Sequence, residues 1–146
     1  MSADDNTAIA RRFFEAFDRN TWDVLGDLCA ANYVGHLSGA PGPLNFEAHK
    51  QFGQMFHAAF PNVSHSIDDQ VAEGDRVVTR VTVRGTHTGD LMGLPPSGKP
   101  MIMAGISVFR MAEGKIAEEW TLFDQMGMMQ QINAIPAPAQ AQAATR

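Results

Sequence analysis

Residues 75–87, DRVVTRVTVRGTH, alternate between charged or polar side chains and small or apolar ones. One parity consists of Thr79, Val81, Val83, Gly85 and His87. The other parity consists of Arg80, Thr82, Arg84 and Thr86. Because successive side chains of a strand point to opposite faces, a period of two is typical of a strand with one buried face. The stretch therefore predicts a β-strand that carries His87 on its apolar face.

Three further segments are rich in β-branched residues and alternate in the same way: 63–72, 101–111 and 115–123. Two connections between these segments are short and contain glycine, AEGD at 72–75 and AEGK at 112–115. Glycine permits the positive φ of a tight hairpin, so the strands on either side should pair antiparallel. The connection at 88–99 is too long for a tight hairpin, which makes it a candidate functional loop.

Upstream, apolar residues recur at helical spacing in three segments: 7–17, 21–30 and 46–60. Asp4, Asp5 or Asn6 is available to cap the first helix, and Thr21 caps the second. Cys29 lies on the apolar stripe of the second helix, where we expect it to pack. Helices followed by strands predict an α+β domain, a cone in which N-terminal helices cover a curved antiparallel sheet and enclose a hydrophobic pocket.

Composition limits the class of protein. The 146 residues are 45% hydrophobic and 18% charged, as expected for one domain at 1–134. Residues 135–146 are an Ala/Pro/Gln tail that we expect to be disordered. A net charge of −5 without a basic run argues against nucleic acid and membrane surfaces as partners. No secretory signal is recognisable and the apolar run 101–109 is too short to span a bilayer, which predicts a cytoplasmic protein.

Several chemistries lack support in the sequence. GLPPSGKP at 93–100 has part of a phosphate-binding loop, but Pro100 replaces the Ser/Thr that would hold magnesium and a strand follows instead of a helix. The five histidines are scattered without ligand spacing, so no metal site is expected. No serine lies in a G-x-S-x-G elbow.

Asp124 follows directly after the apolar run WTLF at 120–123. Aspartate is favoured where a strand gives way to a helix, so one interpretation is an N-cap. The other is a general acid/base whose pKa is raised by apolar walls. The parity of 115–123 does not decide which side chains face inward, because both sets contain large apolar residues.

Other polar candidates also have two interpretations. His87 is either a hydrogen-bonded core histidine or a group that orients a substrate carbonyl. His36 is either a solvated loop residue or a residue at a pocket mouth. Methionines are expected to line an adaptable pocket, or to fill the core or a dimer interface: Met92, Met101, Met103, Met126, Met128 and Met129.

Five blocks occur in a characteristic order between Thr7 and Ile132: FPN, EGDRV, GTHTG, GLPPSGK and GKIAEEW followed by Asp124. Together they resemble the SnoaL-like polyketide cyclases (ester cyclases), part of the nuclear-transport-factor-two-like superfamily of cone-shaped α+β proteins. The resemblance implies a cofactor-independent intramolecular aldol condensation of a hydrophobic polyketide-like carbonyl substrate. Relatives often have histidine immediately before the tryptophan, where this chain has Glu119.

The resemblance also implies that Asp124 is the catalytic acid/base. His87 is the second expected catalytic residue and positions the substrate. The expected substrate-binding residues are His36, Trp120, Ser107, Met103 and Phe56. No metal or other cofactor is implied, and a homodimer or homotetramer is expected. A hydrolase, dehydratase or isomerase on the same scaffold, or a non-catalytic small-molecule-binding protein, is the alternative.

Overall fold

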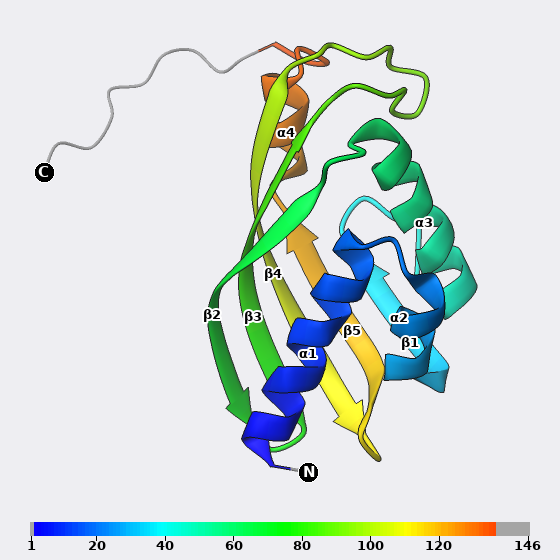
Figure 1. Ribbon diagram of the computed structural model, residues 1–146, viewed down its shortest axis with the longest axis vertical. Coiled ribbons are helices and arrows are strands. Elements are labelled where there is room, and N and C mark those ends of the chain that lie inside the picture. Colours follow the sequence, from blue (N-terminus) through cyan, green and yellow to red (C-terminus); the bar gives the residue numbers. More distant parts are fainter. Residues whose placement is uncertain (1, 137–146) are drawn as a thin grey trace, which may run out of the picture.

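Five strands form one curved sheet in the order β1-β5-β4-β3-β2, with α1 and α3 on one side of it (Figure 1). The computed structural model describes residues 2–136, so the expected tail lies mostly outside the described residues. The helices are α1 (Ala3–Asp18), α2 (Trp22–Leu28), α3 (Phe46–Ala59) and α4 (Gln125–Gln131). The strands are β1 (Cys29–Leu37), β2 (Ser64–Glu73), β3 (Arg76–Thr86), β4 (Pro100–Ala112) and β5 (Lys115–Phe123).

The four predicted strands and both glycine turns are confirmed. Strands β2, β3, β4 and β5 pair antiparallel in sequence order. Gly74 and Gly114 have φ of 59° and 75°, the left-handed conformation that a tight turn needs. The predicted buried parity of β3 is also confirmed, because Val77, Val81 and Val83 are buried.

The expectation of a purely antiparallel sheet is wrong at one edge. Helix α2 ends at Leu28, and Cys29 begins β1, which pairs parallel with β5. Cys29 is therefore not on a helix, although it is buried as expected. The added strand covers an edge of β5 that would otherwise present unpaired backbone groups. The sheet is mixed, and β1 brings Tyr33 beside β5.

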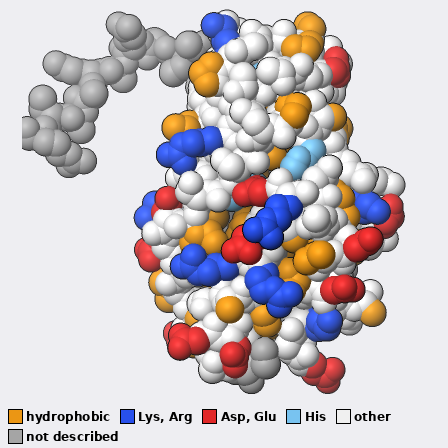
Figure 2. All heavy atoms as spheres, in the orientation of Figure 1, with side chains coloured by type: hydrophobic (Ala, Val, Ile, Leu, Met, Phe, Trp, Pro, Cys, Tyr) orange, Lys and Arg blue, Asp and Glu red, His pale blue; other side chains and the backbone are white. Residues whose placement is uncertain are grey.

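Helix α1 covers the concave face of the sheet. Its N-cap is Ser2, which forms a capping box with Asp5, so the expected cap at Asp4, Asp5 or Asn6 is wrong. Phe13 packs on Phe109 of β4 with ring centroids 5.1 Å apart. On the outer surface of this side, acidic and basic side chains are intermixed (Figure 2).

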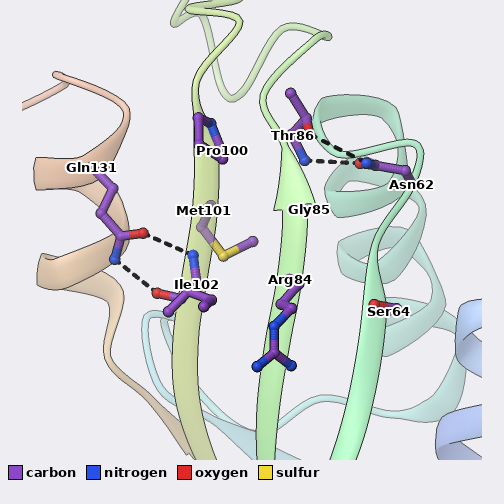
Figure 3. A pocket seen from close by; sticks show the side chains of 9 residues that line it. All are labelled: Asn62, Ser64, Arg84, Gly85, Thr86, Pro100, Met101, Ile102 and Gln131. Carbon is purple, nitrogen blue, oxygen red and sulfur yellow. Dashed lines mark hydrogen bonds between the residues drawn. The ribbon is translucent and has the colours of Figure 1, made fainter.

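Helix α4 protects the part of β4 that extends beyond β5. The amide of Gln131 accepts from the backbone N–H of Ile102 and donates to its carbonyl, both at 2.7 Å (Figure 3). This side chain therefore bonds the strand as a neighbouring strand would. The same two residues line a hollow of about 410 Å³ that continues to Arg84 on β3 and Asn62.

We expect Gln131→Ala to lower the free energy of unfolding by about 1 kcal/mol, because two solvent-exposed hydrogen bonds are lost. Chemical denaturation measures this change. Gln130→Ala, on the same helix, is the matched control and should change stability by less than about 0.5 kcal/mol. Equal effects of the two substitutions would contradict the edge-capping role.

Candidate functional site

From Ala117 onward, strand β5 places its odd-numbered residues inside and its even-numbered residues outside. Glu119 and Thr121 are each only 2% exposed, whereas Leu122 is 70% exposed. Trp120 also lies on the outer face, beside His36 of β1. The carboxylate that this strand buries on the helix-covered face of the sheet is therefore Glu119.

Glu119 is enclosed in a buried hydrogen-bond network. The Tyr33 hydroxyl donates to its Oε1 at 2.7 Å, and the Thr121 hydroxyl donates to its Oε2. Ser107 on β4 lies 2.8 Å from the Thr121 hydroxyl. Because Thr121 gives its proton to Glu119, Ser107 is the donor in that pair. Both carboxylate oxygens thus accept a hydroxyl proton without contact with water.

His49 of α3 extends the network on the other side. Its Nδ1 lies 2.7 Å from the Tyr33 hydroxyl oxygen and 3.7 Å from Glu119 Oε1. Since the Tyr33 proton goes to Glu119, His49 must carry a proton on Nδ1 and donate it to Tyr33. Burial, followed by the nearby charge of Glu119, raises the pKa of Tyr33 far above its ordinary value of 10.0. Tyr33 therefore stays a donor throughout the neutral range.

Asp124 lies outside this network. Its carboxylate is exposed and its Oδ1 accepts from Gly127 N–H at 3.0 Å, which makes it the N-cap of α4. The N-cap interpretation is confirmed, and the expected enclosure by apolar walls is wrong. The cause is the parity of β5, which points Trp120 and Leu122 outward together with Asp124.

His36 and Trp120 come together, but on the outer face. Their rings stack with centroids 5.4 Å apart and planes at 12°. His36 Nε2 contacts Glu118 at 2.7 Å, and Arg76 lies over the Trp120 ring at 5.2 Å. The hydrogen bond with His36 is the largest cause of the lowered pKa of Glu118. This cluster is separated from Glu119 by the thickness of the sheet.

The other predicted site residues lie on the concave side. Ser107 belongs to the Glu119 network. Met103 is buried in the core, and Phe56 is half-buried with its ring 4.9 Å from that of Phe60. Phe60 in turn lies 5.4 Å from the His87 ring. His87 and Phe56 are therefore connected through Phe60 at the end of the sheet that carries the 88–99 loop.

Sequence reasoning missed Tyr33, His49 and Glu119 as a group. From the sequence, Glu119 is recognised only as a departure from relatives, and His49 only as one of five scattered histidines. Their common signal is polarity at positions that the fold buries, which requires the inner parity of β5 to be known. Within the described residues, no group of three or more His, Cys, Asp or Glu side chains is placed to hold a metal ion. No helix between residues 2 and 136 has the length and apolar character of a membrane span.

The family model of the SnoaL-like polyketide cyclases matches residues 7–132. The chain belongs to this family. It is 25% identical over 127 residues to the aklanonic acid methyl ester cyclase DnrD of Streptomyces peucetius, covering 85% of this chain and 88% of that protein. The predicted family is thus confirmed.

Solved structures agree with the assignment. Wild-type IdmH from Streptomyces antibioticus is 32% identical with a TM-score of 0.81, and the match covers 88% of this chain and 98% of that chain. A protein from Catenulispora acidiphila with a ketosteroid isomerase-like fold has a TM-score of 0.73 at 17% identity, over 86% of this chain and 92% of that chain. At that identity the likeness concerns the fold alone. The predicted α+β superfamily fold is confirmed.

Two buried groups, the Cys29 thiol and the Tyr33 phenol, predict a loss of stability at alkaline pH. Burial raises the pKa of Cys29 from 9.0 to about 12, and that of Tyr33 also rises. Below pH 9 both folded and unfolded chains hold these protons. As pH rises from 9 towards 12, only the folded chain keeps these protons. For each of the two groups, the free energy of unfolding should therefore fall by about 1.4 kcal/mol per pH unit.

Urea titrations at pH 8 to 11 measure this slope. Cys29→Ala should remove the decrease in the free energy of unfolding that begins at pH 9. Tyr33→Phe should remove the decrease that begins at pH 10. Identical slopes in both variants and the unmodified chain would contradict the assignment of the two groups.

Proposed function

We propose that this protein is a cofactor-independent enzyme that closes a ring in a hydrophobic, polyketide-like ester by intramolecular aldol condensation. The family and the name of the relative DnrD, an aklanonic acid methyl ester cyclase, support the reaction class. The observation that carries the proposal is the enclosed Glu119 carboxylate with two hydroxyl donors. An aldol closure needs a group that takes and returns one proton out of contact with water.

The reaction balances without an added reagent. Glu119 takes a proton from a carbon between two carbonyl groups, which leaves an enolate. The enolate carbon attacks a carbonyl carbon of the same molecule, a C–C bond forms, and the electron pair of the C=O bond moves to oxygen. Glu119 returns the proton to this alkoxide. Substrate and product are isomers, so one carboxyl group serves both steps.

The surrounding donors suit this exchange. Each carboxylate oxygen has two lone pairs, and Tyr33 and Thr121 occupy one on each. We assign one of the remaining positions to a substrate proton. Tyr33 is itself held by His49, so the phenol has a fixed direction. Charge-assisted bonds from these donors stabilise the carboxylate each time it gives up its proton.

Asp124 is the alternative proton carrier, supported by the family resemblance. It lies at the outer end of β5 and caps α4, and Glu119 is on the opposite face of the same strand. The two carboxylates cannot act on the same substrate atom from these positions. The two assignments of the proton carrier therefore predict opposite effects of substituting Glu119 and Asp124.

We expect Glu119→Gln to slow proton abstraction by about 10²- to 10⁴-fold, because the amide keeps the shape but does not titrate. Asp124→Asn keeps an N-cap side chain and should retain activity within about twofold. The measurement uses aklanonic acid methyl ester in D₂O and follows both deuterium uptake at the acidic carbon and ring closure.

The outcomes separate the hypotheses. Loss of exchange in Asp124→Asn but not in Glu119→Gln would transfer the role to Asp124. An unmodified chain that accelerates neither exchange nor closure over buffer would contradict the reaction class. Thermal melts of both variants establish that each is folded.

A homo-oligomer that uses the outer face of the sheet is also proposed. Leu122 and Ile106 are cross-strand neighbours on this face and are 70% and 47% exposed. Ile102 is exposed on the same strand as Ile106. Apolar side chains grouped in this way favour an interface.

Sedimentation velocity should show that Leu122→Lys shifts the chain towards the monomer, because a buried charge opposes association. Val24→Lys, at an exposed apolar residue of α2, is the control and should leave the oligomer intact. A monomeric unmodified chain, or equal effects of both substitutions, would contradict this interface.

A further inference from the structure

A hollow of about 410 Å³ lies on the outer face of the sheet, at the end where α4 flanks β4. Its floor is formed by β3 and β4 around Gly85 and Met101. Gln131 of α4 lies on one side of this floor and Asn62 lies on the other (Figure 3). The volume falls within the roughly 300–1,000 Å³ of sites for small molecules. The hollow is therefore large enough for a small ligand.

Both sides of the hollow are fixed by hydrogen bonds. Gln131 is bound to both backbone groups of Ile102. Asn62 Oδ1 accepts from the Thr86 backbone N–H at 2.8 Å, and its Nδ2 donates to the Thr86 hydroxyl oxygen at 3.2 Å. Because the backbone N–H orients the Asn62 amide, the Thr86 hydroxyl is the acceptor in this second bond and keeps its own proton. Among residues 2–136 that proton has no acceptor, so it is available to a ligand.

Arg84 is the one charged residue among the described residues that line the hollow. It is exposed and lies opposite Ile102 of β4 and Ser64 of β2. Its Nη1 donates to the Ser66 hydroxyl at 3.2 Å. A guanidinium has five N–H donors, so most of them remain for another acceptor.

Arg84 differs from the other arginines of β3 and β4 in its lack of a carboxylate partner. Within residues 2–136, no carboxylate forms an ion pair with it. The other three arginines each have a carboxylate oxygen at 3.3–3.6 Å: Arg76 with Asp75, Arg80 with Asp68, and Arg110 with Glu118. In a chain of net charge −5, a guanidinium left free in a hollow is suited to an anion from outside the chain.

We propose that this hollow binds a small monocarboxylate. The planar guanidinium of Arg84 forms a bidentate pair with the carboxylate. Thr86 lies two residues along the same face, roughly 7 Å of strand, a distance that a carboxylate with a hydrogen bond on each side can span. The aliphatic part of the ligand covers Pro100 and Ile102, which is 53% exposed.

A phosphate dianion is a poorer match for the hollow. Arg84 supplies one positive charge, and the described residues that line the hollow provide no second one. Phosphate would also leave Pro100 and Ile102 in contact with water. The single charge and the apolar neighbours together favour a monoanion with a short hydrocarbon group.

The site is separate from the Glu119 network and does not rest on the proposed function. Arg84 lies on the exposed face of the sheet and Glu119 on the buried face. Strand β5 pairs with β4 from Gly105 onward, so the hollow lies beyond the end of β5 and of the association surface around Leu122. A carboxylate bound at Arg84 is therefore recognised independently of proton transfer at Glu119.

The test compares butyrate with butyramide, which has nearly the same shape but no charge. Butyrate should move the ¹⁵N–¹H signal of Arg84 Nε and, by isothermal titration, bind about tenfold more tightly than butyramide. Arg84→Gln keeps a donor for Ser66 but removes the charge, so it should weaken butyrate binding by about tenfold. Arg80→Gln is the matched control on the same strand and face. Because Arg80 pairs with Asp68 outside the hollow, this substitution should leave the affinity within about twofold.

Two further variants separate charge from geometry, and thermal melts establish that each variant is folded. Arg84→Lys keeps the charge but not the planar fork, so its affinity for butyrate should lie between those of the unmodified chain and Arg84→Gln. Thr86→Val removes the hydroxyl donor and should weaken butyrate binding by about 2- to 10-fold.

Equal binding of butyrate and butyramide, equal effects of Arg80→Gln and Arg84→Gln, or tighter binding of inorganic phosphate than of butyrate would overturn the proposal. Butyrate binding that occurs only in Leu122→Lys would assign Arg84 to a carboxylate of a second copy, which would also overturn it. Because no turnover is measured, failure of Glu119→Gln to affect catalysis would leave this result intact.

Discussion

The hydrogen bonds that Tyr33 and Thr121 donate to the buried Glu119 carboxylate fix how the edge of the sheet is assembled. Removing a carboxylate from water costs several kcal/mol even after relaxation. Two hydrogen bonds to a charged acceptor contribute about 3–6 kcal/mol together, which is of the same order. The network is thus tolerated only while β1 keeps Tyr33 beside β5. This constraint links the parallel edge strand to the interior of the domain.

The same constraint decides which side chains of β5 face inward. Glu119 inside requires Trp120 and Leu122 outside, where Trp120 stacks on His36 and Leu122 joins an apolar surface. Asp124, at the end of the strand, then serves the start of α4. Helix α4 returns along β4, where Gln131 bonds Ile102. One choice of parity therefore leads to an inward carboxylate, an outward apolar surface and a protected sheet edge.

Much of the fold was predictable because the responsible signals are local. The alternation of 75–87 placed His87 on the buried face, and glycine identified both hairpin turns. Strand β1 was not predictable in this way. Its burial does not alternate regularly, and its partner β5 is distant in sequence. The N-cap of Asp124 was one of two local interpretations, and only the outward parity of β5 separates them.

The two ends of the concave side differ in what holds their polar atoms. Around Glu119, four neighbouring side chains supply or relay protons, so both carboxylate oxygens and all three hydroxyl groups of the network are paired. Around His87, the backbone amide and the hydroxyl of Ser97 both contact Nδ1, and the Phe60 ring lies 5.4 Å from the imidazole. A complete network favours a proton that is exchanged and returned, because every donor has a fixed direction.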